Sequence, residues 1–240
     1  MRTDPISSES LVQASVLYRD SAVIVLNKPA GIAVHRTPKG DECLEDYFSA
    51  LRFGAARNPA LAHRLDKETS GCLVLGREAG ALTRLGKLFQ TGRIAKRYLA
   101  LVQGEPEAAH GVFSRPIVRI DLGRGKWEFR CTEDGQEAHT EYTILERSAG
   151  HSILGLVPLT GRTHQLRLHC QAMGCPIQGD AFYGDGVGAL MLHAYQVMIP
   201  PGSGQPCVEV TAPLPEPFLA ALSQNGMAVP QPITLVKAER

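Results

Sequence analysis

The chain has 240 residues, of which 44% are hydrophobic and 20% are charged, a balance typical of a globular protein with a substantial core. The formal net charge of +1 argues against a strongly basic nucleic-acid-binding protein. No apolar run approaches the roughly 20 residues that span a bilayer, and the polar N-terminus lacks the apolar stretch of a secretory signal. We therefore expect a cytoplasmic protein outside the membrane, whose six cysteines are reduced thiols.

The first half of the chain predicts strands and helices in an irregular alternation. Residues 1–14 are expected to form a flexible tail, followed by one folded domain over 15–240. The predicted elements are, in chain order, two strands around a turn over 16–31, a helix over 42–53, a strand over 71–78, a helix over 78–92 and a strand over 95–104. Gly92 is a stop signal for the second helix.

The second half is richer in strands. Its predicted elements are strands over 127–133, 139–148 and 152–159, a turn and helix over 160–174, strands over 190–199 and 207–213, and a helix over 216–226. Thr163 is the expected N-cap of the helix over 160–174, and Gly174 follows its C-terminus. Hairpins with interspersed helices indicate an α+β fold rather than a regular βαβ alternation.

Two short patterns carry little weight. The sequence GDGVGA over 184–189 matches a dinucleotide-binding fingerprint, but the segment after it alternates like a strand, so we interpret it as a glycine-rich loop. A metal site could be suggested by His164, His169, Cys170 and Cys175. Their spacing is not a common zinc pattern, and we interpret the cysteines as core residues and predict no metal site.

Charged residues gather at three places. Five cations and no acid lie between Ala79 and Gly104, which is consistent with a local basic face or with an ordinary solvated helix face. The sequences HRLDKETSG over 63–71 and GRTHQLRLH over 161–169 lie at junctions between predicted elements. One interpretation is structural, with the first segment a loop and the second the start of a helix. In the other interpretation an aspartate of the first segment and an arginine of the second meet in a cleft, where the arginine keeps the carboxylate ionised.

The sequence HRLDKETSG resembles the H-R-L-D-x-x-T-S-G signature of RluA-type RNA pseudouridine synthases. Further segments resemble the family's other motifs in the same order, namely LNKPAGIAVH, AKRYLALVQG, GRTHQLRLHCQAMGCPIQGDAFYG, and LHA followed by APLP. Arg36 stands where many members have proline, and Gly76-Arg77 replaces a common alanine-lysine pair. No S4-type RNA-binding domain precedes the first motif, so the chain resembles a single-domain member whose catalytic domain covers 15–240.

The resemblance implies a fold and a reaction. The fold is a mixed, largely antiparallel sheet with flanking helices and a central catalytic cleft. The reaction breaks the C1′–N1 bond of a uridine, rotates the freed uracil and joins C1′ to C5, with no cofactor and no metal. The implied catalytic carboxylate is Asp66, which either attacks C1′ or starts an elimination by acting on the sugar, and both routes stay open.

Other residue roles also follow from the resemblance. Tyr98 is expected to stack on the flipped base and take part in proton transfer, and Arg167 to pair with Asp66 and keep it ionised. Arg64 is expected to fill the space that the flipped uridine leaves, and Thr69, Ser70 and Gly71 to form the turn behind Asp66. The residues expected to bind substrate are His63, Arg64, Leu65, Arg162, Thr163 and His164.

The expected partner is RNA, either tRNA or 23S rRNA, and the near-neutral charge and missing RNA-binding domain favour the smaller tRNA. We expect a monomer with no obligatory protein partner. Two other functions are weighed against this one. A non-catalytic RNA-binding protein of the same fold is disfavoured because Asp66, Tyr98 and Arg167 are all present. A nucleoside or glycoside hydrolase needs a second carboxylate to activate water, and only Glu68 lies near in sequence.

Overall fold

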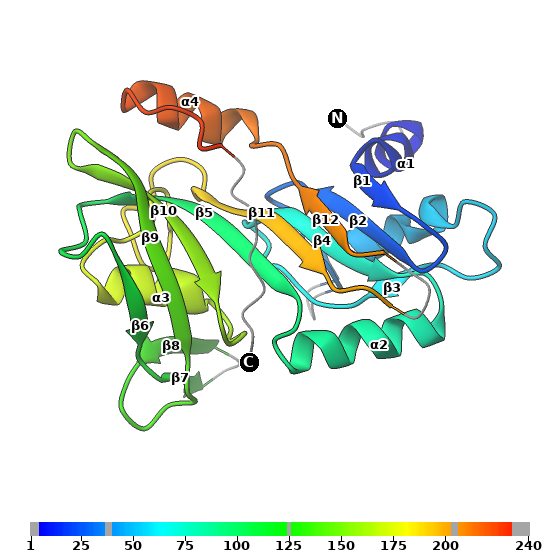
Figure 1. The fold of residues 1–240 in the computed structure, drawn as a ribbon, viewed down its shortest axis with the longest axis horizontal. Helices are drawn as coiled ribbons and strands as arrows, with labels where there is room; N and C mark the ends of the chain where they lie inside the picture. Colours follow the sequence, from blue (N-terminus) through cyan, green and yellow to red (C-terminus); the bar gives the residue numbers. More distant parts are fainter. Residues whose placement is uncertain (1–4, 37–39, 124–125, 203–205, 232–240) are drawn as a thin grey trace. The chain divides into compact units, whose positions relative to one another are not determined.

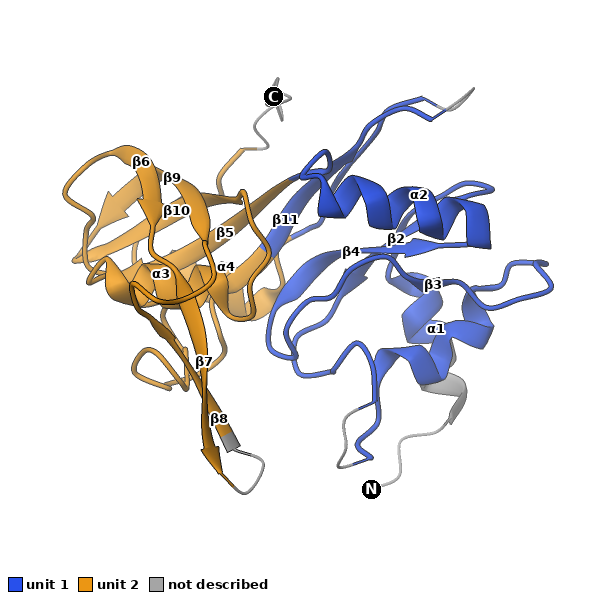
Figure 2. Ribbon diagram, turned by 90° about the horizontal axis from the view of Figure 1, so that it is seen from below, with its two compact units in different colours: residues 1–95, 194–213, 235–240 blue, residues 96–193, 214–234 orange. Residues whose placement is uncertain are grey.

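The computed structural model describes residues 5–36, 40–123, 126–202 and 206–231. The chain divides into two compact units, the first built from Met1–Ala95 and Ala194–Pro213, the second from Lys96–His193 and Leu214–Thr234 (Figure 2). Both contain strands paired antiparallel and a few helices, so the predicted α+β class is confirmed. No helix within the described ranges is long and apolar enough to cross a membrane.

The first unit is built around a sheet in the order β1-β2-β4-β11, with β12 paired to β11 and β3 paired to β4 (Figure 1). Its elements are α1 (Pro5–Ala14), β1 (Val16–Arg19), β2 (Val23–Lys28), the 3₁₀ helix η1 (Leu44–Leu51), β3 (Ala60–Leu61), β4 (Ser70–Gly76), α2 (Ala79–Gln90), most of β11 (Leu192–Ile199) and β12 (Val208–Thr211). The predicted turn between the first two strands is confirmed, because the Asp20 carboxylate accepts the N–H groups of Ala22 and Val23 at 2.7 and 2.6 Å.

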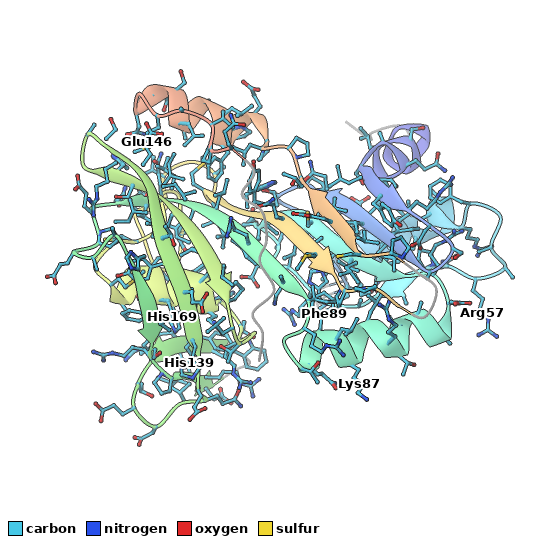
Figure 3. All side chains as sticks on the ribbon, viewed as in Figure 1. Arg57, Lys87, Phe89, His139, Glu146 and His169 are labelled. Atoms are coloured by element: carbon cyan, nitrogen blue, oxygen red, sulfur yellow. The ribbon has the colours of Figure 1, made fainter. Side chains whose placement is uncertain are left out.

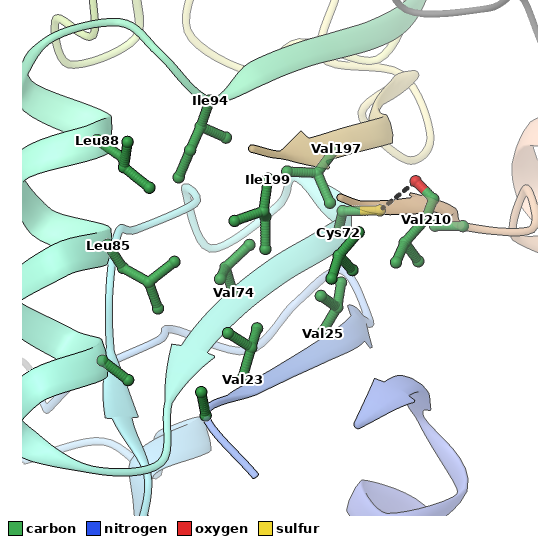
Figure 4. Close-up of a cluster of buried hydrophobic side chains, with 14 residues drawn as sticks. Val23, Val25, Cys72, Val74, Leu85, Leu88, Ile94, Val197, Ile199 and Val210 are labelled. Carbon is green, nitrogen blue, oxygen red and sulfur yellow. Dashed lines mark hydrogen bonds between the residues drawn. The ribbon is translucent and has the colours of Figure 1, made fainter. Parts of the chain in front are cut away.

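A core of apolar side chains joins this sheet to α2 (Figure 4). Residues two apart on a strand share a face, so Val23 and Val25 of β2 lie beside Cys72 and Val74 of β4. The helix covers that face with residues at helical spacing, among them Leu85, which is completely buried. The helix predicted over 78–92 is therefore confirmed, and its buried stripe fixes α2 against the strand that follows the HRLDKETSG segment.

The N-terminal segment differs from the expected loose tail over 1–14. Its described part, residues 5–14, forms helix α1, and residues 1–4 lie outside the described ranges. Val12 is buried, and the Gln13 side-chain amide donates to the Ala50 carbonyl of η1 at 2.7 Å. A tertiary contact with η1 thus stabilises a helix whose sequence has only a weak amphipathic pattern.

The second unit contains a sheet in the order β5-β10-β9-β6, with each adjacent pair antiparallel (Figure 1). Its elements are β5 (Ala95–Gln103), β6 (His110–Ser114), β7 (Ile117–Gly123), β8 (Lys126–Cys131), β9 (His139–Ser148), β10 (His151–Pro158), α3 (Gln165–Ala172) and α4 (Glu216–Gln224). Strands β7 and β8 form a separate antiparallel hairpin. A small apolar cluster of Ile117, Ala138 and Leu168, together with Phe129 and Tyr183, packs this hairpin against α3.

Candidate active site

The segment HRLDKETSG forms a loop between β3 and β4 that is fastened at both ends. The N–H of Ala62 donates to the Val74 carbonyl at 3.1 Å, and the Val74 N–H donates to His63 Nε2 at 2.9 Å. At the other end, the Thr69 N–H donates to the Asp66 carbonyl at 3.1 Å and closes the predicted turn. The backbone around Asp66 is therefore held by the central strand of the first unit.

The side chains of this loop divide into anchors and outward-facing groups. Leu65 is buried at 5% exposure, whereas Arg64 is exposed and Asp66 is half-buried. The ring of His63 stacks on Phe89 with 4.4 Å between centroids. Phe89 lies on the sheet side of α2, opposite Lys87 (Figure 3). His63 and Leu65, which were expected to bind substrate, thus make contacts that position the loop. Arg64 and Asp66 lie at the surface of the loop.

Lys28, at the end of β2, supports this loop from inside the protein. Its side chain is completely buried, and Nζ donates to the carbonyls of Pro29, Ile32 and Lys67 at 2.7, 2.9 and 3.0 Å. Burial lowers the pKa of Lys28 to about 8, although the neighbouring carboxylates of Glu68 and Asp66 raise it. At neutral pH the group is an ammonium whose three donors bind three carbonyls, one of them next to Asp66.

The glycine that ends the loop is required by close backbone packing. Gly71 has a φ of +106°, and a Cβ at this position would lie 2.3 Å from the Ala194 carbonyl oxygen of β11. Gly71 also faces Lys28 across the β2–β4 pair. Only glycine combines this conformation with this approach, which explains why the chain re-enters the sheet through Ser-Gly.

The second unit carries the other predicted catalytic residues. Tyr98 lies on β5, is 9% exposed and faces Leu156 across the β5–β10 pair. Lys96 lies two residues earlier on the same strand and so on the same face, and burial lowers its pKa. The pKa of Arg97 is also lowered by burial. The KRY segment therefore places its aromatic ring in a largely buried position beside two partly desolvated cations.

Arg167, on α3, forms a buried two-pronged ion pair with Asp180. Nε and Nη2 of Arg167 donate to the two carboxylate oxygens at 2.7 and 2.6 Å, and the side chains are 4% and 0% exposed. Asp180 also accepts the N–H groups of Phe182 and Tyr183 at 2.9 and 3.1 Å. Burial raises the pKa of Asp180, but these donors outweigh it and the pKa lies below its usual range. The predicted pairing of Arg167 with Asp66 stays a prediction.

The start of α3 differs in detail from the prediction. The helix begins at Gln165, and its N-cap is His164 with a left-handed φ of +56°, so the N-cap expected at Thr163 is wrong. The Gln165 side-chain oxygen accepts the Arg162 N–H at 3.0 Å and the Thr160 hydroxyl at 2.7 Å, and these bonds hold the loop that precedes the helix. Thr163 and Arg162 are exposed, and Nε of Arg162 donates to the Glu137 carbonyl at 3.0 Å.

The four residues considered as metal ligands are not gathered into one cluster. In the part of the chain that the structure describes, no three His, Cys, Asp or Glu side chains form a metal-binding group. His169 lies within hydrogen-bond distance of the Thr140 hydroxyl through Nδ1, at 2.9 Å, and of the Arg115 carbonyl through Nε2, at 3.0 Å (Figure 3). Cys170 is completely buried, as expected of a core thiol.

Two residues of evident importance were missed in the sequence, Lys28 and Asp180. Both lie inside segments that carry the family resemblance, LNKPAG and GDAFYG, so their letters were available as signals. The predicted glycine-rich loop over 184–189 is confirmed, and Asp185 caps it by accepting the N–H groups of Gly179 and Val187, both at 3.0 Å. The sequence motifs therefore identified the segments of the candidate site, but not the two buried charged side chains, Lys28 and Asp180, that fix the loops of these segments.

Comparison with known proteins gives consistent similarities. A family model described as RNA pseudouridylate synthase matches residues 22–172. An uncharacterised RNA pseudouridine synthase of Zymomonas mobilis is 38% identical over 208 residues, which cover 85% of this chain and 94% of the relative. The ribosomal large subunit pseudouridine synthase C of Haemophilus ducreyi is 34% identical over 213 residues, covering 85% of this chain and 66% of the relative. The structure of human RNA pseudouridylate synthase domain containing 4 matches with a TM-score of 0.79 at 28% identity, covering 94% of this chain and 99% of that one.

Proposed function

Because this chain belongs to the RNA pseudouridylate synthase family, we propose that Asp66 is the carboxylate with which it isomerises uridine to pseudouridine. The chain is an RNA pseudouridine synthase, an isomerase. The observation that supports Asp66 most directly is its setting. It is a half-buried carboxylate on a loop that is hydrogen-bonded to β4 at its start, closed by a turn at Thr69 and held by Lys28 through the Lys67 carbonyl. A rigid loop is what a reacting carboxylate needs, because small displacements cost large factors in rate.

The reaction can be balanced with one carboxylate. The C1′–N1 bond breaks, the uracil turns, the C1′–C5 bond forms, C5 loses its hydrogen and N1 gains one. Asp66 acts either by attacking C1′ and later leaving, or by taking a proton from the sugar and returning it. The ammonium of Lys28 interacts electrostatically with Asp66 and so supplies a positive charge near this carboxylate in both routes. No electron is gained or lost, so the reaction as written needs no redox cofactor.

The remaining predicted residues have complementary roles in this proposal. A stacked uridine has to leave its helix, at a cost of a few kcal/mol, and the exposed guanidinium of Arg64 suits the task of replacing it and contacting phosphate. Tyr98 would stack on the flipped base and pass a proton, and Arg167 would hold the carboxylate ionised. The bidentate contact with Asp180 fixes the plane of the Arg167 guanidinium but also offsets its charge, so the pairing with Asp66 rests on the family resemblance.

We propose that the substrate is a structured RNA in the cytoplasm, either tRNA or 23S rRNA, and that the enzyme acts as a monomer without an obligatory protein partner. The near-neutral charge supports tRNA. The relative named for the large ribosomal subunit supports 23S rRNA. Mapping pseudouridine in total RNA from cells with and without the gene identifies the RNA and the position, because only the true site disappears with the enzyme.

The catalytic assignment is tested with RNA whose uridines carry tritium at C5. Wild-type protein should release tritium without releasing free uracil, and Asp66→Asn should release none while its Kd for RNA stays nearly the same. Glu68→Gln is the matched control, since it removes an exposed carboxylate two residues away. Product from Asp66→Asn above trace, or equal losses in both variants, would contradict the role of Asp66. Binding without tritium release by wild type would favour the non-catalytic alternative, and free uracil would indicate a hydrolase.

A further inference from the structure

Five ring-bearing side chains line one strip of the second unit, and four of them are linked by ring contacts. Trp127 and Phe129 lie two residues apart on β8 and therefore on the same face of the hairpin. The ring of Phe129 is 5.4 Å from that of His164, which is in turn 5.9 Å from Phe182 and 5.6 Å from Tyr183. The strip thus leads from the β7–β8 hairpin to the N-cap of α3, where the GRTH segment lies.

The two ends of this strip are exposed. Phe182 is 73% exposed and Trp127 is 55% exposed, whereas Phe129 and Tyr183 between them pack on the apolar cluster below. An exposed aromatic side chain does not contribute to the hydrophobic core. Exposed aromatic side chains with polar neighbours indicate a binding surface. The rings between the ends hold the strip in place, so the exposed ones are presented in a defined orientation.

The Phe182 end is rigidly built. The N–H groups of Phe182 and Tyr183 both donate to the buried Asp180 carboxylate, and the Tyr183 hydroxyl lies 2.9 Å from His164 Nδ1. The Arg167 guanidinium lies 5.3 Å from the centres of both rings. His164 itself keeps a left-handed backbone, an unfavourable conformation that is often found at functional sites. Because the backbone at Phe182 is already fixed, this segment loses little conformational entropy when a planar group stacks on the Phe182 ring.

Guanidinium groups accompany the rings. Arg119 lies over the Trp127 ring with 4.9 Å to its centre, and Arg162 is exposed two residues before His164. One acid, Asp121, faces Trp127 across the hairpin, and its carboxylate accepts the Gly123 N–H. Aromatic faces interleaved with arginines are the surface that unpaired RNA bases and their phosphates bind, because bases stack on rings and on guanidinium planes.

We propose that this strip, with Phe182 and Trp127 as its exposed stacking platforms, binds unpaired RNA bases that flank the target uridine. The inference rests on the proposed function and extends it, since it assigns a recognition surface outside the predicted catalytic residues. Phe182 and Trp127 then contribute to the choice of RNA, and the structure around the target uridine has to include unstacked nucleotides.

Trp127 is the chain's only tryptophan, so its fluorescence reports directly on one end of the strip. In the Asp66→Asn background, which leaves the RNA unmodified, adding substrate RNA should quench Trp127 emission as a base stacks on it. Phe182→Ala should weaken the Kd about ten-fold, which corresponds to one lost stacking contact. Phe182→Tyr should restore it and Phe182→Leu should not, because leucine keeps apolar area but offers no π-face. Val112→Ala, at a position on β6 that is 56% exposed, is the matched control and should bind as wild type.

A structural role for Phe182 would give a different result. If Phe182 only holds Arg167, Phe182→Ala would lower kcat and leave the Kd unchanged, and the proposal would be overturned. It would also be overturned if RNA bound without altering Trp127 emission, or if Phe182→Leu bound as tightly as Phe182→Tyr. Thermal unfolding of each variant checks that it is folded. Failure of the proposed function is a separate observation, namely no tritium release by the wild-type protein on the same RNA.

Discussion

Replacing Asp180 by asparagine tests the buried ion pair of the second unit. The substitution keeps the shape of the side chain but removes the charge that faces Nε and Nη2 of Arg167. Because the two side chains are 4% and 0% exposed, water cannot take over from the lost carboxylate. Removing one partner of such a pair costs about 3–5 kcal/mol. An asparagine oxygen can still accept the Phe182 and Tyr183 N–H groups, so we expect a loss near the lower limit, about 3 kcal/mol.

The loss is measured by denaturant and thermal unfolding. A change of about 3 kcal/mol lowers the Tm of a protein of this size by roughly 6–12 °C. Asp185→Asn is the control. This exposed aspartate accepts two N–H groups in the next loop and has no arginine partner among the described residues, so its loss should be only about 1 kcal/mol. The folded pKa of Asp180 lies below its usual 3.8, so the stabilisation is complete above that pH and disappears as pH falls through the folded value. Equal losses in both variants, or a gap between wild type and Asp180→Asn that widens in acid, would refute this reasoning.

Three further predictions concern the loop that carries Asp66. Gly71→Ala should prevent stable folding of the first unit, as judged by circular dichroism, because its Cβ would lie 2.3 Å from the Ala194 carbonyl oxygen. Lys28→Met should lower turnover by releasing the loop. It should also abolish a rise in wild-type unfolding free energy of about 3 kcal/mol between pH 8 and 10.5, where the unfolded lysine binds more protons than the folded one. The same pH profile in wild type and variant would contradict the lowered pKa of Lys28. Arg64→Ala should slow the reaction more on folded RNA than on an unstructured strand, and equal slowing on both would exclude a role in replacing the flipped base.

The elements that the sequence predicted well are those whose apolar pattern coincides with burial. Strand β4 and helix α2 fall at the predicted positions because their spacing of leucines and valines matches the core of the first unit. Strands β6 and β7 were not predicted. They alternate between exposed and partly buried residues, and their stability comes from pairing with β9 and β8 rather than from their own composition. The helix predicted over 42–53 is present as the shorter 3₁₀ helix η1.

The candidate site shows the same limit at the level of single residues. The segment around Asp66 was found because its motif is contiguous in sequence. Lys28 was missed because its three acceptors are carbonyls, one of them 39 residues away, and a backbone carbonyl leaves no mark in the sequence. Asp180 was missed as the partner of Arg167 because the two lie 13 positions apart with no regular repeat between them. Thr163 was chosen as a cap on residue type alone, but the N-cap is His164, whose left-handed backbone only the folded loop defines.

Lys28 and Asp180 share a physical logic that the sequence does not display. Each buries a full charge, which is unfavourable unless every donor or acceptor is bound, and in each case the partners are local and complete. An apolar replacement of the whole Arg167–Asp180 pair could fill the space at little cost in stability, whereas replacement of one partner alone could not. What an apolar replacement could not do is fix a loop, because apolar packing does not determine the direction of a carbonyl or an N–H. Lys28 lies beneath the loop that carries Asp66, the proposed catalytic carboxylate. Asp180 lies beneath the loop that carries Phe182, a proposed RNA contact. The unfavourable burial of charge is therefore found where the orientation of a loop matters.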